Sequence, residues 1–129
     1  MSSERFVLDA SALLALLNEE SGGEIVADAL PGAAMSTVNL SEVVAKLSEH
    51  GMPIAAVENA VSGLGIELHD FDRESAFATG ALRPDTKGLG LSLGDRACIA
   101  LGTRLGLPML TADRRWTKLG GHITVHLVR

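Results

Sequence analysis

Short apolar runs alternate with longer helix-forming segments along the whole chain, and this alternation limits the possible folds more than any other feature of the sequence. Five runs have the length and composition of β-strands, at residues 5–9, 33–36, 66–70, 108–111 and 123–128. No hairpin signal and no internal repeat interrupts the order. Strands separated by helices predict an α/β fold with a parallel sheet covered on both faces, and we expect a single domain over residues 1–129.

The helix-forming segments have recognisable ends. Helices are predicted at residues 11–20, 24–30, 39–50, 53–64, 73–82 and 92–106. Ser11 and Asp72 are the expected N-caps of two of them, residues 83–91 read as a glycine-containing loop, and a turn or short helix follows Asp113. Because crossovers between parallel strands are right-handed, the turns from strand to helix fall at the carboxyl edge of the sheet, where open α/β sheets bind ligands.

Composition narrows the class of protein. Hydrophobic residues make up 47% of the chain without low-complexity tracts, which argues against disorder. No apolar run approaches the roughly 20 residues that span a bilayer, and the N-terminal segment lacks the basic leader of a signal peptide. The single cysteine, Cys98, lies in an apolar helix and has no disulfide partner in the chain. We therefore expect a cytoplasmic protein without membrane contact, in which Cys98 is a buried hydrophobe.

Charge is distributed unevenly. The net charge is −5, yet residues 1–82 carry three basic and thirteen acidic side chains, whereas residues 83–118 carry seven basic and three acidic ones. The basic segment is either a solvated helix face or a surface that meets a polyanion. If this segment meets a polyanion, the candidates for binding its phosphate groups are Arg83, Lys87, Arg96, Arg114 and Arg115.

Four acidic residues are predicted to meet at the carboxyl edge of the sheet. Asp9 follows the first strand, Glu42 lies in the first turn after the second, and Asp113 lies just beyond the fourth. Asp95 lies in the first turn of the helix that leads into the fourth strand. Burying an unpaired charge such as that of Asp9 is strongly unfavourable, so helix amides, an arginine or a cation must compensate it. If the other three acids lie beside Asp9, a divalent cation would offset their mutual repulsion. Oxygen ligands without Cys or His favour Mg²⁺ or Mn²⁺.

Each acid also has a structural alternative. The spacings at 39–42 and 92–95 both fit a capping box, in which the acid bonds back to the amide of the capping residue. Asp113 has the alternative of starting a turn. The alternative role of Arg96 and Arg114 is to neutralise the acids beside them without a metal. The sequence alone leaves these alternatives open.

Four segments resemble the PIN-domain family, and within it the toxin ribonucleases of VapBC toxin–antitoxin pairs. They are VLDASALLALLNEE, STVNLSEVVAKL, GLSLGDRACIALG and PMLTADRRW, and they cover nearly the whole chain in order. The resemblance implies a Rossmann-like α/β/α sandwich with a central parallel sheet. It also implies a catalytic and metal-binding pocket formed by Asp9, Glu42, Asp95 and Asp113. Ser11, Asn39 and Thr111 match polar positions around that pocket.

The same resemblance implies a Mg²⁺- or Mn²⁺-dependent endoribonuclease that acts as the toxin of such a pair. Asp9, Asp95 and Asp113 would hold one or two ions, directly or through water, and Glu42 would hold or orient a coordinated water. In-line attack would leave a 5′-phosphate and a 3′-hydroxyl. The implied partners are an RNA substrate, a cognate antitoxin and a second copy of the chain, with the apolar helices of residues 11–30 and 39–64 as the dimer face.

Other classes of function fit less well. A haloacid-dehalogenase-type phosphatase needs a second aspartate where this chain has Ser11. A phosphoacceptor receiver domain needs a lysine soon after the strand at 108–111, and none follows closely. The alternative that stays open is a non-catalytic module that binds RNA or an antitoxin on the same fold. Trp116 is expected to cover the core rather than to stack on a base.

Overall fold

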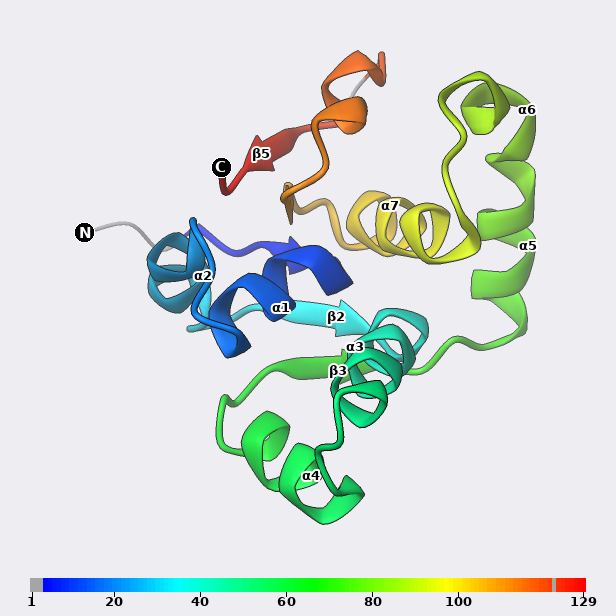
Figure 1. Cartoon of the computed structure of the whole chain (residues 1–129). Helices are drawn as coiled ribbons and strands as arrows, with labels where there is room; N and C mark the ends of the chain where they lie inside the picture. The colour runs from blue at the N-terminus through cyan, green and yellow to red at the C-terminus, as the bar shows by residue number, and fades with distance from the viewer. Residues whose placement is uncertain (1–3, 122) are drawn as a thin grey trace.

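A parallel sheet forms the centre of the computed structural model, which describes residues 4–121 and 123–129. The strands are β1 (Val7–Leu8), β2 (Ala34–Ser36), β3 (Glu67–His69), β4 (Met109–Thr111) and β5 (Val125–Leu127). Every pairing in the described sheet is parallel, and the spatial order is β3-β2-β1-β4-β5 (Figure 1). This arrangement confirms the predicted α/β class, and it places β3 at one edge of the sheet.

Helices connect the strands as the periodicity predicts. They are α1 (Ala10–Leu17), α2 (Gly23–Ala29), α3 (Thr37–Glu49), α4 (Ile54–Ser62), α5 (Arg73–Ala81), α6 (Arg83–Thr86) and α7 (Leu93–Leu105), with the 3₁₀ helices η1 (Lys87–Leu89) and η2 (Arg114–Lys118). The prediction of a loop at 83–91 is wrong, because α6 and η1 occupy most of it. Pro84 suits the first turn of α6, where a missing N–H costs nothing, and the Thr86 hydroxyl donates to the Leu82 carbonyl. None of the described helices has the length and apolar character needed to cross a membrane.

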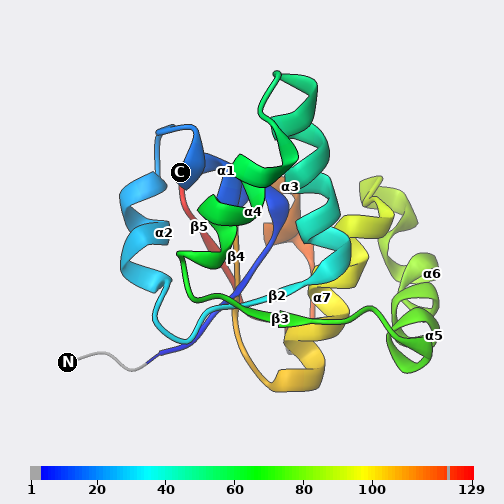
Figure 2. The ribbon, with the colours of Figure 1, turned by 90° about the horizontal axis from the view of Figure 1, so that it is seen from below.

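The two faces of the sheet pack against different helices, because successive side chains of a strand point in opposite directions. One face, formed by Leu8, Met35 and Leu110, packs against α1 to α4. The other face, formed by Val7, Ala34 and Met109, packs against α7 and η2. Helix α5 lies outside α7, away from the sheet (Figures 1 and 2). The result is the expected α/β/α sandwich.

Helix α7 and η2 complete the second face of the core. Cys98 and Trp116 are fully buried there, which confirms Cys98 as a small core residue and Trp116 as a cover of the core. Gly102 lets α7 approach the sheet closely, since a Cβ at that position would overlap the side chain of Met109. The inner face of α7 is therefore fixed firmly against β1 and β4.

Candidate active site

The strand order changes direction between β1 and β4. From β1 the chain passes to β2 and β3 on one side, whereas β4 and β5 extend on the other. Open α/β sheets bind ligands at the carboxyl ends of strands at such a point. Asp9 follows β1 directly, and Asp113 lies two residues beyond the end of β4.

Asp9 is a buried carboxylate with a full set of protein donors. Its side chain is 3% exposed, and it is the N-cap of α1, which corrects the prediction of Ser11 for that role. Oδ1 accepts hydrogen bonds from the Ala12 amide at 2.8 Å and the Ser11 hydroxyl at 2.7 Å, and Oδ2 accepts from the Thr111 hydroxyl. Burial raises the pKa of Asp9 from 3.8 to about 6, with these hydrogen bonds acting in the opposite direction.

Ser11 and Thr111 connect the two strand ends. The Ser11 hydroxyl also accepts from the Ala112 amide at 2.9 Å, and the Thr111 hydroxyl accepts from the Asp113 amide at 3.0 Å. Each hydroxyl thus donates to Asp9 and accepts from the segment that carries Asp113. The two side chains fix the orientation of Asp9 and the start of the segment after β4 together.

Glu42 lies against the first turn of α7. The alternative of a capping box at 39–42 is excluded, because Ser36 caps α3 and Asn39 lies inside the helix. The Asn39 amide instead donates to Glu42 Oε1 and to the Gly94 carbonyl, both at 3.0 Å. A Cβ at Gly94 would overlap the Glu42 carboxylate, so the absence of a side chain at Gly94 is what leaves room for it. The pKa of Glu42 is raised, first by burial and then by the charge of Asp95.

Asp95 combines a structural and an electrostatic role. The capping box predicted at 92–95 is confirmed: the Ser92 amide donates to Asp95 Oδ2 at 2.8 Å, and the Asp95 amide donates to the Ser92 hydroxyl at 3.2 Å. The negative charge of Asp95 nevertheless also raises the pKa values of Asp9 and Glu42. Burial and the charges of these three acids raise the pKa of the Cys98 thiol, which lies in the helix one turn further on. Capping therefore does not remove Asp95 from the acidic group.

Asp113 is held by Arg115. The Arg115 Nη2 atom lies 2.6 Å from Asp113 Oδ2, and Nε donates to both oxygens of this carboxylate at 3.1 Å. These hydrogen bonds lower the pKa of Asp113. The same Nη2 atom lies 3.6 Å from Asp95 Oδ2, so one guanidinium joins two of the four acids.

The remaining basic candidates differ in their exposure and contacts. Arg83, Lys87 and Arg114 are exposed, and in the described part of the chain none of them forms an ion pair. Arg96 is half-buried, and its Nη1 atom donates to the Thr79 carbonyl at 3.3 Å. The neutralising role considered for Arg96 and Arg114 thus belongs to Arg115. The spacing Asp113-x-Arg115 at the start of a 3₁₀ helix was the signal for it in the sequence.

An open groove gives solvent access to Glu42. It has a volume of about 480 Å³, and its lining includes Thr37, Ser41, Glu42, Ser92 and Gly94. These residues belong to the N-terminal turns of α3 and α7, where backbone N–H groups favour a negatively charged ligand. A polyanion can therefore reach Glu42 from this side.

The donor set suits a hard divalent cation. The group consists of four carboxylates, including that of Asp9, and it contains neither His nor Cys. The buried charge of Asp9 has no cationic partner among the described contacts. Among residues 4–121 and 123–129, however, no three Asp, Glu, His or Cys side chains are arranged to hold one metal ion as they stand. The residue types fit Mg²⁺ or Mn²⁺, and the side chains would have to turn toward a common point to share one ion.

Comparison with known protein families agrees with the fold. Residues 6–121 match the PIN domain. The match covers most of the chain and includes all four acids. The chain therefore belongs to the PIN-domain family.

Within that family, the chain is similar to VapC ribonucleases. It is 31% identical over 114 residues to "VapC ribonuclease Mb2780c" of Mycobacterium bovis and to "Ribonuclease VapC42" of Mycobacterium tuberculosis, covering 81% of this chain and 87% of each relative. Among solved structures, a toxin–antitoxin complex from Klebsiella pneumoniae superposes with a TM-score of 0.76 at 18% identity, covering 96% of this chain and 98% of that one. DNA-bound VapBC from Salmonella typhimurium gives a TM-score of 0.74 at 18% identity, with 98% and 99% covered. These structures share the fold.

Proposed function

We propose that the protein is a Mg²⁺- or Mn²⁺-dependent endoribonuclease and the toxin of a toxin–antitoxin pair. The observation that carries the proposal is the gathering of Asp9, Glu42, Asp95 and Asp113 from four separate segments at the switch point between β1 and β4. The similarity to VapC ribonucleases supports RNA as the substrate.

The four acids would have different roles in the reaction, according to their surroundings. Asp9, Asp95 and Asp113 would hold the cation, whose chemistry when bound is to make water a better nucleophile and to stabilise charge that develops on the phosphodiester. Ser11 and Thr111 keep Asp9 in one rotamer by donating to its two oxygens. Glu42, half-buried beside Gly94 with a raised pKa, would orient the attacking water and accept its proton.

The basic side chains would hold the RNA. Arg83, Lys87 and Arg114 are exposed and free of ion pairs within the described residues, so they can meet phosphate groups without breaking an internal contact. The half-buried Arg96 lies one residue from Asp95 and would act closer to the acids. The cleavage would leave a 5′-phosphate and a 3′-hydroxyl.

The proposal includes two protein partners. The superposed structures include a toxin–antitoxin complex and a DNA-bound VapBC, which supports a cognate antitoxin for this chain. We also propose a homodimer. Large apolar side chains are exposed on the helices expected to form its interface, including Ile25 at 43% and Ile54 at 56%.

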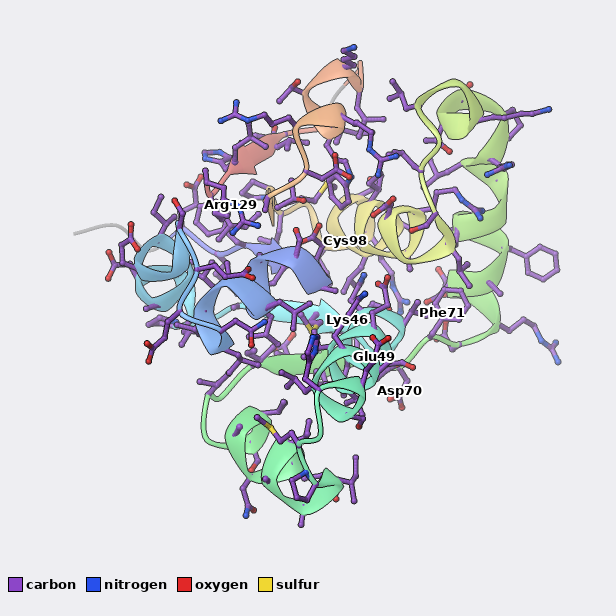
Figure 3. All side chains as sticks on the ribbon, viewed as in Figure 1. Lys46, Glu49, Asp70, Phe71, Cys98 and Arg129 are labelled. Carbon is purple, nitrogen blue, oxygen red and sulfur yellow. The ribbon has the colours of Figure 1, made fainter. Side chains whose placement is uncertain are left out.

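The test is cleavage of RNA by the purified protein with Mg²⁺, with Mn²⁺ and with EDTA. We expect cleavage with either ion, none in EDTA, and loss of at least about 100-fold in Asp95→Asn, because removal of a ligand weakens the metal site. Asp70→Asn is the matched control. Asp70 is exposed just after β3, at the carboxyl edge of the sheet (Figure 3), and none of the described contacts links it to the four acids. This variant should therefore cleave like the parent.

Two results would count against the proposal. If Asp95→Asn cleaves as fast as the parent, the acidic group is not the catalytic site. If the parent binds RNA without cutting it under any divalent cation, the fold serves as a binding module instead.

A further inference from the structure

Arg115 occupies the space between two of the four acids. Its Nη2 atom lies 2.6 Å from Asp113 Oδ2 and 3.6 Å from Asp95 Oδ2. The other terminal nitrogen, Nη1, donates to the carbonyl oxygens of Leu89 and Gly90, both at 3.1 Å. The guanidinium is thus anchored on one side by the backbone that precedes α7 and faces the acids with the other.

This anchoring distinguishes Arg115 from an ordinary surface ion pair. All three guanidinium nitrogens have partners, and the contact with Asp113 uses both carboxylate oxygens. This bidentate geometry fixes the orientation of the guanidinium plane. The neighbouring Arg114 has the same charge, and no described acid pairs with it. The sequence therefore holds two adjacent arginines, of which only Arg115 contacts the acids.

We propose that Arg115 is a positioning residue that competes with the divalent cation for Asp95 and Asp113. The inference rests on the proposed function, since it assumes that these acids bind the ion. The Arg115 Nη2 atom faces Oδ2 of both Asp95 and Asp113. An ion held by the same two acids would therefore compete with the guanidinium for their negative charge. In the metal-free protein Arg115 neutralises part of the acidic group in place of the ion.

The competition between Arg115 and the divalent ion favours the ion at high ion concentration. A divalent ion interacts with each carboxylate about twice as strongly as a single positive charge at equal distance, so it displaces Arg115 once its concentration is high enough. Arg115 is about half exposed, and the displaced guanidinium can be hydrated at little cost. Arg115 thus raises the ion concentration at which the site fills, without preventing filling.

The experiment is calorimetric titration of Mn²⁺ into metal-free parent, Arg115→Ala, Arg115→Gln and Arg114→Ala proteins. We expect Mn²⁺ to bind Arg115→Ala about three- to tenfold more tightly than the parent. Arg115→Gln should also bind Mn²⁺ more tightly than the parent. Its amide retains a donor for the 89–90 carbonyls, so this variant serves if Arg115→Ala folds poorly. Arg114→Ala removes an equal charge one residue away, and its affinity for Mn²⁺ should stay within about twofold of that of the parent.

The outcomes separate this inference from the function on which it rests. If the parent does not bind Mn²⁺, the proposed metal-dependent function fails and this inference with it. If the parent binds Mn²⁺ but both folded Arg115 variants bind it equally or more weakly, only the competition is overturned. If Arg114→Ala gains as much affinity as Arg115→Ala, the effect is one of net charge, and the competition is again overturned.

Discussion

The carboxylate of Asp9 is ionised at an energetic cost to the metal-free protein. Its pKa is about 6 in the folded protein against 3.8 as the ordinary value, because burial disfavours the charged form. Between these two pH values the folded protein holds a proton that the unfolded chain has released. The cost is therefore fully present above pH 6, shrinks as the pH falls, and is absent below about pH 4.

Replacement of Asp9 by asparagine should consequently stabilise the metal-free protein at neutral pH. We expect Asp9→Asn to raise the free energy of unfolding by about 1–3 kcal/mol at pH 7.5, since the shift of roughly two pKa units is lost and Oδ1 can still accept from Ser11 and the Ala12 amide. Urea unfolding in EDTA measures this change, and the gain should disappear near pH 4.

Asp113→Asn is the opposing control for that measurement. Arg115 lowers the pKa of Asp113, so the ionised form of Asp113 stabilises the fold above its ordinary pKa and the stabilisation is lost as the pH falls. We expect Asp113→Asn to lower the stability of the metal-free protein at pH 7.5. An Asp9→Asn protein less stable than the parent at that pH would contradict this account of Asp9.

At the scale of single residues, the sequence identified the acids but not all of their partners. Asp9 was identified because it directly follows a buried strand, where a charged side chain is rarely explained by the fold alone. The hydrogen bond from the Asn39 amide to the Gly94 carbonyl joins residues 55 positions apart, so no local sequence pattern could predict it. Arg115 was expected to bind RNA, and its contact with Asp95 depends on how η2 and α7 lie in space.

At the scale of elements, the fit between α3 and α7 depends on Gly94. Alanine is normally about 1 kcal/mol more favourable than glycine inside a helix, but a Cβ here would displace the Glu42 carboxylate, which is the end of a flexible side chain. We expect Gly94→Ala to keep or slightly raise the melting temperature while the rate of RNA cleavage falls at least about tenfold, because Glu42 loses its position.

Gly80→Ala is the matched control for Gly94→Ala. Gly80 is also helical, in α5, and a Cβ there meets nothing within 4 Å. This variant should retain the parent's cleavage rate and gain similar stability. Full activity in Gly94→Ala would show that the position of Glu42 is unimportant for the reaction.

Element boundaries were predictable where one pattern dominated. Short apolar runs predicted every described strand, and longer helix-forming segments predicted the long helices. The spacing of Ser92 and Asp95 indicated the start of α7. The start of α3 was misplaced because Asn39 offered a plausible cap, whereas Ser36 performs that role two residues before Val38. Helix α6 escaped prediction since four residues are too few to show a period.

At the scale of the whole molecule, the order β3-β2-β1-β4-β5 brings distant segments together. The strand–helix alternation predicted parallel strands and their common carboxyl edge, but it did not specify that β1 and β4 are neighbours. That adjacency allows Thr111 to bond Asp9 across 102 positions. The homodimer and the antitoxin stay predictions, as does the RNA substrate.

The central claim is that Asp9, Asp95 and Asp113 share a divalent cation at this switch point, with Glu42 beside it. The most direct measurement is anomalous X-ray diffraction from crystals of the parent protein soaked in Mn²⁺. The account predicts a manganese peak within about 2.5 Å of carboxylate oxygens of these three aspartates, with the Arg115 guanidinium moved away from Asp95 and Asp113. Manganese peaks found only elsewhere on the molecule, with these aspartates unchanged, would contradict it.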